Sequence, residues 1–97
     1  MRDTLCQAIR NQNVVEFQYD RLPRKVEPHK VGRTTAGNIV LSGYQIGGRS
    51  HSNEVPYWRL YKIRKIGGLN VASESFDGAR PRYSRTDDRM TQIFCRL

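Results

Sequence analysis

Apolar and polar side chains alternate along much of this chain. In residues 14–19, Val15, Phe17 and Tyr19 fall on one face of an extended segment, and the remaining residues fall on the other. A period of two is typical of a half-buried β-strand. We expect four further strands on the same grounds, at residues 26–34, 39–46, 57–66 and 69–76.

The N-terminal segment has a different spacing. Leu5 and Ile9 lie four residues apart, which places them on one face of a helix. Asp3 is a residue type that commonly caps a helix N-terminus. This pattern predicts a short helix over residues 3–12.

Turn-forming residues separate these elements. We expect turns at residues 20–25, which contain Pro23, and at 35–38, where Gly37 permits a positive φ. Residues 47–56 are expected to form a loop that starts with two glycines. Pro28 lacks an N–H group, so its strand should be an edge strand or bend there.

The order of elements indicates a single mainly β (α+β) domain over residues 1–97. Short strands joined by short connections, in so few residues, suggest a small barrel or a curled sheet. We assign the helix to residues 3–12, the barrel to residues 13–76 and a C-terminal segment to residues 77–97. Residues 89–97 are apolar enough to return to the body of the domain.

Positive charge is concentrated in the middle of the chain. The net charge is +8, and residues 21–66 contain ten basic and two acidic side chains. Such a field attracts polyanions, including nucleic acids and nucleotides. Arginine outnumbers lysine 13 to 4, and guanidinium groups suit bidentate phosphate contacts. The alternative is a basic surface without any role in nucleic-acid binding.

No residue pattern indicates catalysis or a metal site. His29 and His51 are 22 positions apart, and neither lies at ligand spacing from a cysteine. Cys6 and Cys95 are too few for a typical disulfide framework, so we expect two packed free thiols and a cytoplasmic protein. We therefore expect no enzyme activity, catalytic residue, metal or cofactor, and no membrane association.

The segment "YWRLYKIRKI" (57–66) mixes aromatic, aliphatic and basic residues on both of its faces. Arg59 lies between Tyr57 and Tyr61, an arrangement suited to holding phosphates and stacking bases. The structural alternative is that Tyr61 and Ile63 point inward while Arg59 extends along the rim. This stretch alone favours neither.

Several motifs together resemble those of the WYL domain, a small bacterial module. They are "LCQAIRNQNVVEFQYD", "VEPHKVGRTTAGNIVLSGYQ" and "WRLYKIRKI", and they span about residues 4–76. The resemblance implies a five-stranded Sm-like or SH3-type barrel that senses nucleic-acid fragments or nucleotides, in transcription regulation or phage defence. The remaining residues look like the tail of small stand-alone members.

The resemblance also implies a set of ligand contacts. It carries over His29, Arg33, Tyr44, Arg59 and Lys62, and we add Arg49 and Ser50 from the glycine-rich loop. Two positions depart from the family pattern. Ile39-Val40-Leu41 replaces the Trp-Tyr-Leu triplet, which removes an aromatic pair, and Arg64 replaces the usual Asp, which makes the surface more basic.

Two functions are compatible with these features. The first is a ligand-binding module for single-stranded nucleic acid or a nucleotide. The second is an interaction or oligomerisation subunit, in which the apolar "QIFCRL" (92–97) pairs with a partner protein or a second copy. A membrane-surface role is the least favoured, because no amphipathic helix with basic flanks is evident.

Overall fold

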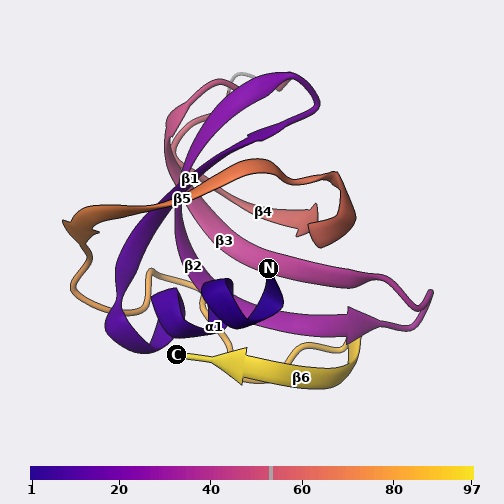
Figure 1. The fold of residues 1–97 in the computed structure, drawn as a ribbon. Coiled ribbons are helices and arrows are strands. Elements are labelled where there is room, and N and C mark those ends of the chain that lie inside the picture. The colour runs from indigo at the N-terminus through magenta and orange to yellow at the C-terminus, as the bar shows by residue number, and fades with distance from the viewer. Residues whose placement is uncertain (53) are drawn as a thin grey trace.

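A computed structural model describes residues 1–52 and 54–97 of the chain. One helix, α1 (Arg2–Asn11), is followed by a single antiparallel sheet that curls on itself without closing (Figure 1). The strands of the described residues are β1 (Asn13–Tyr19), β2 (Leu22–Thr34), β3 (Ile39–Gly48), β4 (Tyr57–Lys62), β5 (Gly67–Ser75) and β6 (Met90–Arg96). The mainly β fold class is confirmed, and the C-terminal return segment supplies a strand beyond the five expected.

The long strand β2 organises the sheet, whose order is β4-β3-β2-β1-β5. β3 follows one edge of β2. β1 pairs with residues 22–26 and β6 with residues 30–34 along the other edge. Pro28 lies between the part of β2 that pairs with β1 and the part that pairs with β6. No described strand pairs with Pro28 on this edge, so its missing N–H group costs no hydrogen bond there. The register with β3 also shifts between Pro28 and Lys30, so the expected bend is confirmed and β2 is not an edge strand.

The β1–β2 connection is shorter than expected. Asp20 and Arg21 alone form the turn, with φ values of 51° and 65°. Positive φ at both central residues is typical of the two-residue hairpin turn that matches the twist of the strands. Pro23 therefore lies within β2 opposite Gln18, and the expected turn over residues 20–25 is wrong.

The glycine pair at residues 47–48 belongs to β3, not to the following loop. Gly48 has a φ of +81°, and a Cβ atom there would collide with the carbonyl oxygen of Pro23. Only glycine satisfies both constraints. The connection to β4 therefore covers residues 49–56, and β3 ends against the start of β2.

The helix begins one residue earlier than expected. Met1 is its N-cap, so Asp3 lies in the first turn and makes no capping hydrogen bond. Asp3 still places negative charge near the positive end of the helix dipole. Leu5 and Ile9 are buried in the core, as their spacing indicates.

Tyr61 is the largest fully buried side chain of the core. Its ring makes edge-to-face contacts with Phe17 and Tyr19, with centroid distances of 5.0 and 5.1 Å. Tyr61 therefore points inward, as one reading of residues 57–66 proposed. The strand itself ends at Lys62, because residues 63–65 form a 3₁₀ turn, so the expected strand over 57–66 is too long.

A disulfide joins Cys6 of α1 to Cys95 of β6, with a Cα–Cα distance of 5.6 Å. The expectation of two free thiols is therefore wrong. Both residues are in the apolar environment that the sequence indicates, but β6 pairs with β2 beside the helix and brings the two sulfurs together. The bond closes almost the whole chain into one loop, and both chain ends lie at this side of the molecule (Figure 1).

Candidate nucleic-acid interface

A groove of about 800 Å³ lies between β4 and the segment 82–89 that precedes β6. Its floor is one row of the sheet, in which Lys30, Ser42 and Leu60 are register partners across β2, β3 and β4. Side chains from the polar C-terminal segment form the opposite wall. The groove therefore depends on how that segment is held against the sheet.

Two contacts fix the start of the wall. The Arg80 guanidinium donates hydrogen bonds of 2.7 and 2.8 Å to the two carboxylate oxygens of Glu27, a buried residue of β2. The indole N–H of Trp58 donates to the carbonyl oxygen of Pro81 at 2.9 Å. Bidentate ion pairs fix orientation as well as distance, so the segment enters the groove in a defined direction.

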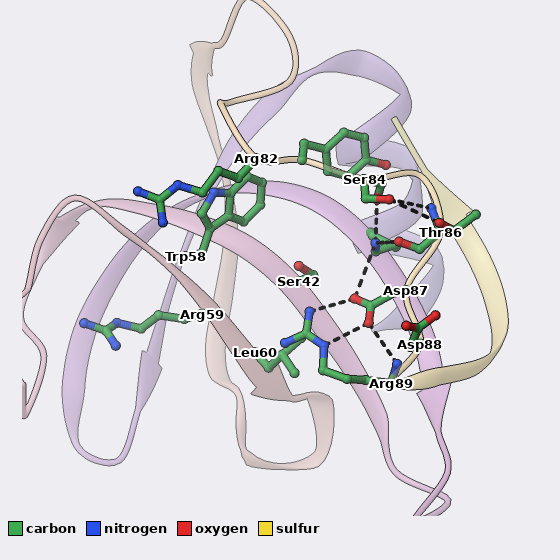
Figure 2. A pocket seen from close by; sticks show the side chains of 12 residues that line it. Ser42, Trp58, Arg59, Leu60, Arg82, Ser84, Thr86, Asp87, Asp88 and Arg89 are labelled. Carbon is green, nitrogen blue, oxygen red and sulfur yellow. Dashed lines mark hydrogen bonds and ion pairs between the residues drawn. The ribbon is translucent and has the colours of Figure 1, made fainter.

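An ion cluster closes one end of the groove (Figure 2). Arg89 donates two hydrogen bonds of 2.8 and 2.7 Å to Asp87, and the Lys30 ammonium lies 3.4 Å from the same carboxylate. Lys30 also donates to the carbonyl oxygens of Ser84 and Thr86. Hydrogen bonds from Arg89 hold the pKa of Asp87 far below its usual range. The ammonium of buried Lys30 and the guanidinium of exposed Arg89 are thus both paired with the same carboxylate.

The other end combines an exposed cation with aromatic rings. Figure 2 shows Arg82 beside Trp58, with both Arg82 and Arg59 extending away from the ion cluster. Trp58 is half-buried and lies nearly parallel to Tyr83, with a centroid distance of 6.2 Å. Arg82 is exposed and has no acidic partner among the residues described. This end offers what stacking and phosphate binding require.

A second group of polar residues lies beyond Arg59 and comes from the neighbouring strands β2, β3 and β4. We define the mouth cluster as Arg24, Gln45, Arg59 and Tyr61. Arg59 donates through Nε to Gln45 Oε1 at 3.2 Å, and Arg24 donates through Nη1 to the same oxygen at 3.3 Å. The second donor group of Arg59, Nη2, bonds to Ser52 Oγ and the Glu54 carbonyl oxygen, both at 2.7 Å.

Arg49 and Ser50, two expected ligand contacts, lie next to this cluster. The carbonyl oxygen of Arg49 accepts a hydrogen bond from the Gln45 side chain at 3.0 Å, and its own side chain is exposed. Ser50 is buried, and its hydroxyl lies 3.1 Å from that of Ser52. The structure therefore places Ser50 and the backbone of Arg49 near Arg59.

His29 occupies the interior instead. Its ring is 0 % exposed, Nδ1 lies 2.8 Å from the Glu27 carbonyl oxygen, and Nε2 accepts the backbone N–H of Arg80 at 3.2 Å. Burial is the main cause that lowers the pKa of His29, and the charges of Arg80 and Lys30 add to it. Both ring nitrogens are engaged, so His29 has no free atom for a ligand and serves as a structural residue.

The remaining expected contacts are dispersed. Tyr44 packs edge-to-face on Trp58 and lies under the Arg80 guanidinium, which is 4.9 Å from its ring centroid. Arg33 lies over the ring of Phe94 from β6. Lys62 ends β4 and lines none of the groove. These three residues do not converge with the mouth cluster.

Sequence reasoning missed several residues of this region, among them Trp58, Gln45 and Ser52. Arg24 was assigned to a turn, yet it lies in β2 and is only 5 % exposed. Arg82 and Tyr83 lie in a polar segment without periodicity, so nothing in the sequence places them opposite β4. One signal could have identified Arg24. In a strand that starts at Leu22, Arg24 lies on the same face as the apolar Val26, which indicates that its side chain is buried.

No group of three or more His, Cys, Asp or Glu side chains among the described residues is placed to hold a metal ion. None of the described helices has the length and apolar character needed to cross a membrane.

Comparisons with known proteins found no matching family model, no matching curated protein and no matching solved structure. The resemblance to WYL domains stays a prediction from the motifs.

Proposed function

We propose that this domain is a non-enzymatic module that binds single-stranded nucleic acid or a nucleotide. The observation that carries the proposal is the open end of the groove, where Arg59 and Arg82 extend on the same side as the Trp58 indole (Figure 2). Guanidinium groups would contact phosphates there, and the Trp58–Tyr83 pair would support a base. The concentration of positive charge in residues 21–66 would attract the strand.

The role of such binding would be regulatory, in transcription or phage defence, as the WYL resemblance implies. In this proposal the domain reports ligand binding to a partner, either another protein or a second copy. The segment 92–97 was the expected contact, but β6 already uses one edge to pair with β2. A partner would therefore have to use the other edge of β6 or a different surface.

A cytoplasmic location is part of the proposal, and it requires that the domain be stable in a reducing environment. Cytosolic thiols are generally kept reduced, so the domain would have to remain folded without the Cys6–Cys95 bond. The core supports this, because Leu5 and Ile9 anchor α1 independently of the sulfurs. Alkylation of the protein in intact cells, followed by mass spectrometry, would show which form is present.

Fluorescence anisotropy with labelled single-stranded DNA and RNA, at several salt concentrations, tests the binding function. We expect affinity to fall with salt, with a logarithmic slope of about −0.7 per phosphate contacted. Arg82→Ala should weaken binding and reduce the slope by one contact. Arg10→Ala is the matched control, because it removes one exposed positive charge from α1, outside the groove.

Two results would overturn the proposal. One is the absence of binding to single-stranded DNA, single-stranded RNA and mononucleotides at low salt. The other is an equal loss of affinity in Arg82→Ala and Arg10→Ala, since that would show only a general attraction to a basic protein.

A further inference from the structure

The mouth cluster contains more hydrogen-bond donors than acceptors. Gln45 Oε1 is approached by Arg24 Nη1, Arg59 Nε and the Tyr61 hydroxyl, at 3.3, 3.2 and 3.0 Å. A carbonyl oxygen has two lone pairs, so three donors exceed its capacity. The Nε of Arg24 is buried and finds no acceptor among the residues that the structure describes.

The cluster also lacks a negative charge. Arg24 is only 5 % exposed, and neither Arg24 nor Arg59 forms an ion pair with any described carboxylate. Burial raises the pKa of Tyr61 to about 12, so its hydroxyl keeps its proton at neutral pH and supplies no counter-charge. The rings of Tyr19 and Tyr61 lie 5.7 and 5.9 Å from the Arg24 guanidinium, near the outer limit for cation–π attraction.

Arg24 Nη2 donates to the Tyr19 carbonyl oxygen at 3.1 Å, so both guanidinium groups have only neutral acceptors among the described residues. An anion beside them would stabilise their charges. The neighbouring groups suit an oxyanion. Ser50 and Ser52 place their hydroxyls 3.1 Å apart beside Arg59, and the two acceptors of Arg59 Nη2 are the neutral Ser52 hydroxyl and Glu54 carbonyl oxygens. Anionic oxygens in their place would form stronger, charge-assisted hydrogen bonds.

We propose that the mouth cluster binds a terminal phosphate monoester, held between Arg24 and Arg59 with the serine hydroxyls as further donors. A phosphate monoester carries close to two negative charges at neutral pH, which matches the two unpaired arginines. Arg24 and Ser50 are buried, so a ligand that reaches them would have to enter with its end, whereas an internal phosphodiester needs an exit on both sides. This inference rests on the proposed function, and it names the end of the strand as the recognised feature.

The test compares short oligothymidylates that carry a 5′-phosphate, a 3′-phosphate or hydroxyl groups at both ends. We expect one phosphorylated form to bind about tenfold more tightly than the unphosphorylated strand. The difference between the 5′ and 3′ forms identifies the end that enters. Inorganic phosphate should compete with that gain and should raise the melting temperature of the protein in the absence of oligonucleotide.

Variants locate the effect. Arg24→Gln and Arg59→Gln should each abolish the preference for the phosphorylated end. Because Arg24 is buried and its variant could fail to fold, Ser52→Asp is the second approach. Ser52 is exposed, and an aspartate there would place a resident anion beside Arg59. We expect Ser52→Asp to remove the phosphate preference and the phosphate-induced rise in melting temperature, and Ser52→Asn, with the same shape and no charge, to retain both.

The outcomes separate this site from the groove. Arg82→Gln should weaken all three oligonucleotides equally and leave the ratio between phosphorylated and unphosphorylated strands unchanged. Equal affinity for phosphorylated and unphosphorylated strands would overturn the terminal-phosphate site and leave strand binding intact. Stabilisation by inorganic phosphate without binding of any oligonucleotide would overturn the proposed function and leave an anion site. If Ser52→Asp kept the preference for phosphorylated strands, the phosphate site could not lie beside Arg59.

Discussion

The Arg80 guanidinium and the Glu27 carboxylate form a bidentate ion pair across 53 positions of sequence. Glu27 is buried in β2, while the side chain of Arg80 is 43 % exposed. The pair holds the start of the C-terminal segment against the sheet, together with the Trp58–Pro81 and His29–Arg80 hydrogen bonds. Its two partners are unequal, since only Glu27 is cut off from water.

This inequality predicts an asymmetric response to mutation. Arg80→Ala leaves a buried carboxylate without a partner and should lower the free energy of unfolding by about 3 kcal/mol. Glu27→Gln leaves Arg80 partly solvated and should lower it less. We expect the double variant Arg80→Ala/Glu27→Gln to be more stable than Arg80→Ala alone, as measured by urea denaturation. If the double variant is the least stable of the three, the cost of the buried charge is not what dominates.

The ion cluster at the closed end of the groove predicts sensitivity to acid. The pKa of Asp87 is lowered from an ordinary value near 3.8, chiefly by hydrogen bonds from Arg89. The folded state therefore binds the proton less readily than the unfolded state. The resulting stability is fully present above about pH 4 and is lost as the pH falls below it.

Asp87→Asn tests this dependence. It should lower stability at neutral pH, because Lys30 is buried and loses its carboxylate. It should also flatten the loss of melting temperature below pH 4. Asp88→Asn is the control, since Asp88 is an exposed neighbour with no ion pair among the residues described. An identical acid profile in both variants would remove Asp87 from the explanation.

The disulfide predicts a redox-dependent stability. Cys6 and Cys95 are separated by 89 positions, and closing a loop of that length restricts the unfolded chain by about 4–5 kcal/mol in the chain-entropy model. We expect Cys95→Ser to lower the free energy of unfolding by about 2–4 kcal/mol, with the far-UV circular dichroism spectrum unchanged. The double variant Cys6→Ser/Cys95→Ser should lose no more than this, because either substitution removes the same bond. An oxidised and a reduced protein with equal denaturation midpoints would contradict the prediction.

Local patterns in the sequence account for the helix and for the positions of β1, β3 and β5, and for parts of β2 and β4. The alternation of Val15, Phe17 and Tyr19 predicts β1, and Gly37 marks the β2–β3 turn, whose observed φ is 86°. These features depend on neighbouring residues only. The β1–β2 turn was misplaced for two reasons. Asp20 and Arg21 adopt positive φ without a glycine, and Pro23 suggested a turn at residues that belong to β2.

Long-range relationships account for what the sequence could not reveal. The disulfide forms because β6 pairs with the far half of β2, and nothing near Cys6 indicates that pairing. The mouth cluster depends on Arg24 and Arg59 meeting across three strands. The binding expectation identified Arg59 from its aromatic neighbours, but its buried partner lies in a different strand, at a position that the misplaced turn had excluded.

The last prediction concerns His29, which was expected to contact a ligand and instead joins β2 to the C-terminal segment. Arg80 donates its backbone N–H to Nε2, so the single proton of the neutral ring lies on Nδ1 and is donated to the Glu27 carbonyl oxygen. Protonating Nε2 would break the bond to Arg80. Burial lowers the pKa of His29 below its ordinary value of 6.5, so its contribution to stability is fully present above pH 6.5 and is lost as the pH falls toward the folded value.

Nuclear magnetic resonance can follow this titration directly. The chain has two histidines, so His51→Ala leaves every imidazole signal to His29. We expect the His29 signals to show the Nδ1–H tautomer at neutral pH and to titrate below pH 6.5. The melting temperature of His51→Ala should begin to fall as the pH drops below 6.5, before the acid-induced loss that Asp87 produces below pH 4 begins. A His29 ring that titrates at 6.5, or that carries its proton on Nε2, would show that the C-terminal segment is not bound to it and that the groove wall is held in another way.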